Sequence, residues 1–305
     1  MRIGLMTTPW EHPDDVVAVA RMAEERGIES MWLGEHSHLP VTTRHAFSDS
    51  TPEFYRRVPD PYITLAATAA ATASIRIGTA IALPAEHDPL DLAKKIATLD
   101  AVSNGRFEWG VGYGWNRLEM VNRGLDPRFR MARFREVVLA VRALWTQETA
   151  AFDGAHVRFT ESWSWPKPVQ RPHPPILLGC RPGPRAFAQL AEFCDGWLPS
   201  VTQCRDGIEG ALDGLRTTWA AAARGDHPRL TFVDTGFWSD VDVETFRSRT
   251  TATARLLTRL EDLGADRLIV GMPWFRRADA EPMLDVVAML TTRSTGAGQI
   301  STTSV

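Results

Sequence analysis

The segment Ser30–Pro40, SMWLGEHSHLP, joins a short apolar run to a group of polar side chains. The run Met31–Leu33 is typical of a strand that is buried on both faces. It is followed at once by Glu35, His36 and His38. Carboxylate and imidazole groups just past the carboxyl end of a buried strand lie where parallel α/β folds carry their chemistry. The rest of the chain is therefore interpreted as a scaffold for this strand end.

Eight apolar runs along the chain, including the one at 30–33, predict a parallel sheet. Each run is followed by a helical pattern, and together the pairs predict strands at 2–6, 30–33, 75–83, 106–112, 174–179, 195–200, 229–237 and 266–273, with helices at 13–27, 61–74, 88–103, 127–147, 184–193, 206–223, 242–263 and 279–292. The runs are continuous rather than alternating, as strands covered on both faces require. Eight right-handed strand–helix units predict a single (β/α)8 TIM barrel. A doubly wound open sheet is the competing fold, but no G-x-G-x-x-G follows the first strand.

Two longer segments and a tail interrupt this regular pattern. Residues 34–60 are polar and irregular, and residues 150–174 are rich in Trp and Pro, with a possible hairpin at Ala151–Phe159. Long excursions in a compact domain are usually functional. We expect one barrel over residues 1–290 and a disordered tail over 291–305, because the tail is small and polar.

The composition limits the classes of function. A chain of 305 residues with 44% hydrophobic content is long enough for one barrel, and its net charge of −3 gives no reason to expect nucleic acid or membrane as a partner. Three cysteines and eight histidines show no metal-ligand spacing, so no metal site is predicted. We expect a cytoplasmic protein, because no secretory pattern opens the chain and no apolar run reaches membrane-spanning length.

The polar group after the second strand is the first candidate for chemistry. His36 would be the acid–base or charge-stabilising group, because imidazole titrates near neutral pH. Glu35 would accept a hydrogen bond from a ligand. His38 could serve instead of His36, and an ordinary polar surface loop is the alternative interpretation.

The exit of the fourth strand is glycine-rich. Gly110, Gly112 and Gly114 alternate, and Trp115 follows them. Alternating glycines weaken a strand unless a ligand or another backbone must come close. Tight packing inside the barrel is the alternative to a ligand contact.

The exit of the fifth strand, LGCRPGPR at 178–185, predicts an anion site. A strand, a glycine loop and Pro184 at a helix start leave backbone N–H groups free to bind a phosphate. Arg181 and Arg185 add positive charge, and a plain connecting loop is the alternative. Cys180 is expected to be a buried, inert thiol.

Taken in order, these motifs resemble the bacterial-luciferase-like flavin and deazaflavin oxidoreductases. The matching segments are Gly34–His36, IRIGTAIALPAEHDP at 75–89, SNGRFEWGVGYGWN at 103–116 with Glu119 after it, RALW at 142–145, PKPVQRPHPPILLG at 166–179, and GPRAFAQLAEFCDGWLP at 183–199. The resemblance covers nearly the whole chain. It is nearest to the branch that uses coenzyme F420, an 8-hydroxy-5-deazaflavin, rather than FMN.

The resemblance implies a cofactor ring at the barrel mouth, with Glu35 and His36 beside it. It also implies a non-prolyl cis peptide at Ala80–Ile81, supporting the ring, and a cofactor phosphate near the loop after the fifth strand. The residues expected to bind the cofactor are Ala80, Ile81, Gly112, Gly114, Gly179, Cys180, Arg181, Gly183, Pro184 and Arg185.

The chain departs from the family pattern at the fourth strand. Several similar F420-dependent dehydrogenases carry a glutamate just after the glycine motif, where this chain has Trp115, and the nearest carboxylate is Glu119. The substrate pocket is instead expected to be apolar and aromatic. Its predicted residues are Trp10, His38, Trp115 and Trp274.

The predicted function is hydride transfer between F420 and a small organic substrate, in a homodimer. The cofactor carries the two-electron chemistry, so the protein would supply orientation and charge stabilisation. Two alternatives stay open: an FMN-dependent monooxygenase fed by a separate reductase, and a non-catalytic barrel that only binds a cofactor.

Overall fold

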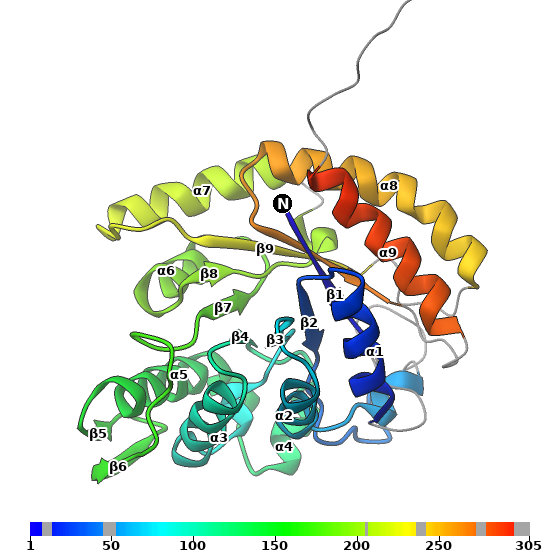
Figure 1. The fold of residues 1–305 in the computed structure, drawn as a ribbon. Helices are drawn as coiled ribbons and strands as arrows, with labels where there is room; N and C mark the ends of the chain where they lie inside the picture. The colour runs from blue at the N-terminus through cyan, green and yellow to red at the C-terminus, as the bar shows by residue number, and fades with distance from the viewer. Residues whose placement is uncertain (8–13, 45–52, 205–206, 236–241, 273–278, 296–305) are drawn as a thin grey trace, which may run out of the picture.

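Eight parallel strands close into a barrel surrounded by helices (Figure 1). The computed structural model describes residues 1–7, 14–44, 53–204, 207–235, 242–272 and 279–295. The barrel strands are β1 (Arg2–Met6), β2 (Ser30–Leu33), β3 (Arg76–Thr79), β4 (Phe107–Gly112), β7 (Ile176–Gly179), β8 (Gly196–Trp197), β9 (Arg229–Asp234) and β10 (Arg267–Gly271). Their order around the barrel is β1-β10-β9-β8-β7-β4-β3-β2. The predicted (β/α)8 TIM barrel is confirmed.

Helices follow the strands and cover the outside of the barrel (Figure 1). They are α1 (Asp14–Glu25), α2 (Pro61–Ala71), α3 (Pro89–Val102), α4 (Arg117–Asn122), α5 (Arg130–Thr146), α6 (Pro184–Phe193), α7 (Ile208–Ala221), α8 (Val243–Asp262) and α9 (Ala280–Thr295). Short 3₁₀ turns lie at Glu53–Arg57, Pro84–Glu86, Pro127–Phe129 and Val201–Cys204. In the described ranges, no helix is both long and apolar enough to span a membrane.

Two predicted boundaries were wrong and one helix was missed. The third strand was expected to reach residue 83, but β3 ends at Thr79, and beyond it only an isolated bridge between Ala82 and Val111 continues the pairing with β4. The short helix α4 was not predicted. The last helix continues to Thr295, so the first residues assigned to the tail are helical, and residues 296–305 lie outside the described part of the chain.

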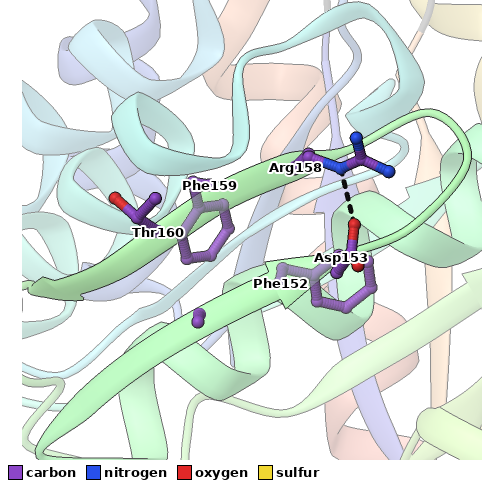
Figure 2. Close-up of a pocket in the computed structure, with 6 residues that line it drawn as sticks. Phe152, Asp153, Arg158, Phe159 and Thr160 are labelled. Atoms are coloured by element: carbon purple, nitrogen blue, oxygen red, sulfur yellow. Dashed lines mark ion pairs between the residues drawn. The ribbon is translucent and has the colours of Figure 1, made fainter.

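The predicted hairpin is present and longer than expected. Strands β5 (Thr149–Asp153) and β6 (Arg158–Trp163) pair antiparallel at the edge of the molecule. Figure 2 shows a shallow hollow on this hairpin, with Phe152 and Phe159 on neighbouring strands and an ion pair between Arg158 and Asp153. This hollow involves no residue of the barrel mouth.

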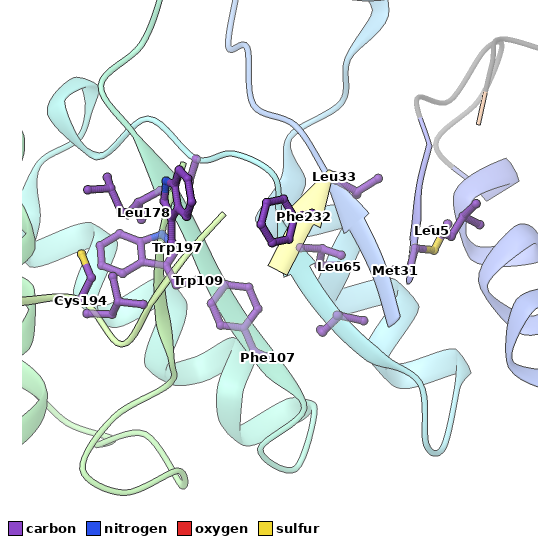
Figure 3. Close-up of a cluster of buried hydrophobic side chains, with 14 of the residues drawn as sticks. Leu5, Met31, Leu33, Leu65, Phe107, Trp109, Leu178, Cys194, Trp197 and Phe232 are labelled. Atoms are coloured by element: carbon purple, nitrogen blue, oxygen red, sulfur yellow. The ribbon is translucent and has the colours of Figure 1, made fainter. Parts of the chain in front are cut away.

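Two apolar clusters hold the barrel together. The larger joins the outward side chains of the strands to the helices, and Figure 3 shows part of it, including Phe107, Trp109 and Trp197. The smaller contains no helix residue and fills the barrel interior: Met6, Trp32, Ala80, Leu177, Leu198, Val233 and Ile269. A Cβ at Gly78 would lie 2.4 Å from the Trp32 ring, so the glycine makes room for the indole.

A buried ion network closes the end of the barrel where the strands begin. Arg267, only 2% exposed, donates to Glu29 at 2.8 Å and to Glu108 at 2.9 and 3.0 Å. Arg76 also donates to Glu108, at 2.6 Å. This network leaves the opposite end, where the strands finish, as the open mouth for a site.

Candidate active site

An imidazole–carboxylate pair lies at the barrel mouth. His36, just after β2, has its Nδ1 atom 2.8 Å from Oε1 of Glu119 on α4. Glu119 is fully buried. Asn116 Nδ2 donates to the same oxygen at 3.0 Å and to Thr43 Oγ1 at 3.1 Å. Two strand ends that are far apart in sequence thus supply one acid–base pair.

Local sequence explains where Glu119 points. Asn116 is the N-cap of α4, because its side chain accepts a hydrogen bond from the Leu118 N–H at 3.2 Å. Glu119 follows three residues later, the spacing of a capping box. Here its carboxylate meets the Asn116 side chain rather than the backbone, and this contact orients it toward His36.

Two aromatic rings enclose His36. The His36 ring centroid lies 5.1 Å from that of Tyr55 and 5.6 Å from that of Trp115, both edge to face. Tyr55 and Trp115 are themselves 5.8 Å apart. Burial raises the pKa of the Tyr55 phenol well above its usual value, so the hydroxyl stays neutral. The wall beside His36 is therefore aromatic and uncharged, and it includes Trp115, whose place in the substrate pocket stays a prediction.

Glu35 is occupied by protein partners. Its Oε2 accepts the Leu83 N–H at 2.6 Å, and its Oε1 lies 2.6 Å from His87 Nε2. The side chain is buried. These contacts tie the loop after β2 to the segment after the cis peptide. They favour a positioning role for Glu35 over the ligand contact that we expected.

A third carboxyl group, Glu86, lies beside the pair. Its Oε2 accepts Arg123 Nε at 3.1 Å, and Arg123 also donates to Ser37 Oγ at 2.6 Å. Burial, with the negative charge of Glu119, raises the pKa of Glu86 to about 7, although Arg123 opposes the shift. Four buried side-chain atoms lack a hydrogen-bond partner among the described residues: Glu86 Oε1, Glu119 Oε2, His38 Nε2 and Arg130 Nε.

The cis peptide shapes the floor of the mouth. Ala80–Ile81 is cis, as the resemblance implied. A Cβ at Gly112 would lie 2.1 Å from Ile81 Cδ1, and one at Gly179 would lie 2.9 Å from Ile81 Cγ2. These two glycines therefore let Ile81 pack flat across the ends of β4 and β7. For Gly112 the structure supports tight packing, which was the alternative to a direct ligand contact.

The predicted anion loop has the expected form. Helix α6 begins at Pro184, with Gly183 as its N-cap. Arg181 and Arg185 are exposed, and neither makes a hydrogen bond or ion pair within the part of the chain that is described. The loop and the two guanidinium groups are therefore available to bind an anion.

Two other predicted residues near this loop can be placed. Cys180 is buried, which raises the pKa of its thiol to about 12 and agrees with an inert role. Its carbonyl accepts Trp197 Nε1 at 3.0 Å. Gly114 has a φ of +75°, which a side chain would disfavour, so it serves the turn after β4.

The structure distinguishes the two candidate histidines. His38 Nδ1 lies 2.9 Å from the neighbouring Ser37 Oγ, whereas His36 reaches the buried Glu119. Only His36 is thus paired with a carboxylate. Trp10 and Trp274, predicted for the substrate pocket, lie outside the described residues. Within the described ranges, no group of three or more His, Cys, Asp or Glu side chains could hold a metal ion.

Sequence reasoning did not assign roles to Glu86, Tyr55, Asn116 or Arg123. The Asn116-x-x-Glu119 spacing could have predicted α4 and the direction of Glu119. No local signal distinguishes Glu86 from a surface acid, because its burial and its contact with Arg123 arise from tertiary packing.

The comparisons with known proteins identify the family. A model of the luciferase-like monooxygenase family matches residues 1–237, well over half of the chain. The chain therefore belongs to the luciferase-like monooxygenase family and is an enzyme of this oxidoreductase type.

Three relatives and one structure show the range of this similarity. An uncharacterized Mycobacterium tuberculosis protein is 39% identical over 94% of this chain and 98% of its own length. An F420-dependent glucose-6-phosphate dehydrogenase from Amycolatopsis mediterranei is 26% identical over 82% of this chain and 77% of its own. An FMNH2-dependent dimethylsulfone monooxygenase from Pseudomonas putida is 34% identical over 50% of this chain and 42% of its own length. The monooxygenase RslO1 from Streptomyces bottropensis shares the fold, with a TM-score of 0.80 and 22% identity. The match covers 97% of this chain and 100% of that protein.

Proposed function

We propose that this protein transfers a hydride between coenzyme F420 and a small organic alcohol or carbonyl compound. The observation that carries the proposal is the His36–Glu119 pair, whose atoms lie 2.8 Å apart at the barrel mouth. Hydride transfer to or from an alcohol carbon must be accompanied by movement of the hydroxyl proton. A positioned imidazole near neutral pH is suited to that task.

The residues at the mouth fit a flat, anionic cofactor. Ile81 packs against Gly112 and Gly179, where a Cβ would collide with it, and forms a smooth floor for a ring. The exposed Arg181 and Arg185 flank a helix start, which suits a phosphate. When bound, a deazaflavin supplies or accepts the hydride.

The chain's own residues would then move the proton. With Glu119 ionised, its Oε1 accepts the Nδ1 proton of His36, which leaves Nε2 as the atom that takes the substrate proton. As His36 becomes charged, Glu119 stabilises it. Tyr55 and Trp115 contact the imidazole ring of His36 from its sides and keep water away from it.

The extent of similarity supports F420 over FMN. The F420-dependent relative matches 82% of this chain, including the segment that holds β9, whereas the FMN-dependent relative matches 50%. An FMN-dependent monooxygenase is the second candidate, because that shorter match has the higher identity, 34%.

Titration and turnover test the proposal together. Purified protein is titrated with F420 and with FMN by fluorescence, and each complex is then assayed against a panel of alcohols and carbonyl compounds. We expect tighter binding of F420 and cofactor absorbance changes that depend on substrate. Tighter FMN binding with oxygen uptake would identify a monooxygenase. Binding without any turnover would favour a non-catalytic barrel.

A further inference from the structure

The carboxyl group of Glu86 has contacts that the His36–Glu119 pair does not explain. It is buried, yet only its Oε2 has a partner, the Arg123 guanidinium at 3.1 Å. Its Oε1 has no hydrogen-bond partner in the described ranges, and neither has Oε2 of Glu119. Leaving a buried carboxylate oxygen unpaired is costly unless a proton neutralises the group.

The charges around Glu86 are out of balance. It feels the charges of Glu119 on α4, of Arg123 just after that helix, and of Glu35 and His36 in the loop after β2. The charges of three carboxyl groups are thus set against those of one guanidinium and one imidazole.

The remaining neighbours of Glu86 do not correct this imbalance. Arg133 on α5 is directed at backbone carbonyls, those of Ala85 and His87. His87 itself contacts Glu35. A buried carboxyl group with one unpaired oxygen and a single charged partner favours its protonated form.

We propose that Glu86 is protonated for part of the time near neutral pH, and that it is a further acid–base group that exchanges protons with the His36–Glu119 pair during turnover. The pKa of Glu86, raised to about 7, agrees with this geometry. A half-protonated group can both give and take a proton. A substrate cation is a poorer occupant, because the two unpaired oxygens are closed to solvent.

The use of this proton in turnover rests on the proposed function. In substrate oxidation, the hydroxyl O–H bond breaks and its proton moves to His36 Nε2, while the C–H hydride leaves for the cofactor and the C=O bond forms. His36 is then charged and stabilised by Glu119, and it becomes neutral again when an ionised Glu86 takes up one proton from the His36–Glu119 pair. Reduction of a carbonyl compound runs through the same atoms in reverse.

Infrared difference spectroscopy tests the protonation of Glu86 without any cofactor. The full-length protein is titrated between about pH 5 and pH 9, a range that brackets the midpoint near 7 expected for Glu86. We expect the C=O band of a protonated carboxyl group to disappear with that midpoint. Glu86→Gln should remove this transition, and Glu119→Gln should lower its midpoint because a neighbouring negative charge is lost.

Two further variants make the assignment specific. Glu86→Asp keeps a carboxyl group and should retain a transition at a shifted midpoint. Glu24→Gln is the control, because Glu24 accepts backbone N–H groups and its pKa is lowered to about 2, so the band should be unchanged. A band that persists in Glu86→Gln, or no transition in the parent, would overturn the proposed protonation of Glu86.

The role in turnover is measured separately with the loaded enzyme. The pH dependence of kcat should lose the limb near pH 7 in Glu86→Gln, while the Kd of the cofactor is unchanged. An unaltered pH profile would refute the role of Glu86 in turnover. If the infrared transition behaves as expected but neither cofactor supports turnover, the proposed function fails and the protonation of Glu86 stands.

Discussion

Both ends of the barrel bury carboxyl groups, but the surroundings shift the pKa values of these groups in opposite directions. Where the strands begin, burial alone would raise the pKa of Glu108, yet Arg267 and Arg76 outweigh it and hold the pKa at about 2. At the mouth, burial and the charge of Glu119 raise the pKa of Glu86 to about 7. The first end has a nearly complete ion network, and the second has buried oxygens without partners in the described residues.

This difference separates residues that serve the fold from residues that serve chemistry. A buried ion network in which each charged group has its partners favours a single protonation state. A carboxyl group with an unpaired buried oxygen is costly, and groups with strongly shifted pKa values cluster at functional sites. The comparison therefore assigns Glu108 to the scaffold and Glu86 and Glu119 to the active site.

The largest expected effect is the loss of the imidazole at the mouth. His36→Ala should lower kcat by a factor on the order of 10²–10⁴, because one acid–base group is lost. The Kd of the cofactor should change little, since the floor and the anion loop remain. Steady-state kinetics and fluorescence titration measure both. An unchanged kcat would remove His36 from the mechanism, and His38→Ala would be measured next.

The second-largest expected effect is a loss of stability at the end of the barrel where the strands begin. Arg267→Met should lower the free energy of unfolding by about 3–5 kcal/mol, because it leaves buried carboxylates without their partner. Arg259→Met is the matched control: Arg259 also makes a two-pronged contact with a glutamate, Glu209, but the side chains are 54% and 50% exposed. The control should cost no more than about 1 kcal/mol in urea denaturation. Equal losses would show that burial does not distinguish the two pairs.

Stability as a function of pH should sharpen the contrast. Because the folded pKa of Glu86, about 7, lies above its ordinary value of 4.5, its contribution to stability is present below pH 4.5 and is lost as pH rises through 7. Relative to Glu86→Gln, the parent should lose up to about 3 kcal/mol between acid and alkaline pH. Denaturation curves at several pH values measure this difference. Parallel stability profiles for the parent and the variant would contradict the raised pKa.

The smallest effect in this series concerns the anion loop. Arg185→Glu should weaken cofactor binding by about tenfold or more at low salt, because it replaces an attraction to phosphate with a repulsion. The melting temperature should hardly change, since an acidic residue is tolerated in the first turn of a helix. Arg255→Glu, exposed within α8, is the charge-matched control and should leave the Kd unchanged. Equal Kd values for Arg185→Glu and the parent would place the phosphate elsewhere.

Much of the scaffold could be predicted from local sequence. Continuous apolar runs identified all eight strands, and Pro184 and Asp88 marked helix starts that the structure confirms. The short strand β3 was overextended, because the apolar run 75–83 continues past Thr79, where regular pairing gives way to a single bridge at Ala82.

The contacts that define the site could be predicted less well. His36 and Glu119 are 83 residues apart in sequence, and Glu108 and Arg267 are 159 apart. Such pairs depend on barrel closure and strand register, which no local pattern contains. Glu119 was noted as the nearest carboxylate to Trp115, but only the capped turn of α4 directs it toward His36.

The central claim is that His36 and Glu119 act as one unit, and a double-mutant cycle tests it most directly. The rate of hydride transfer is measured in single turnover for His36→Ala, Glu119→Gln and the double variant, each at saturating cofactor. The account predicts that the double variant is hardly slower than His36→Ala, because groups that act as a unit lose their contribution only once. Losses that multiply in the double variant would contradict it.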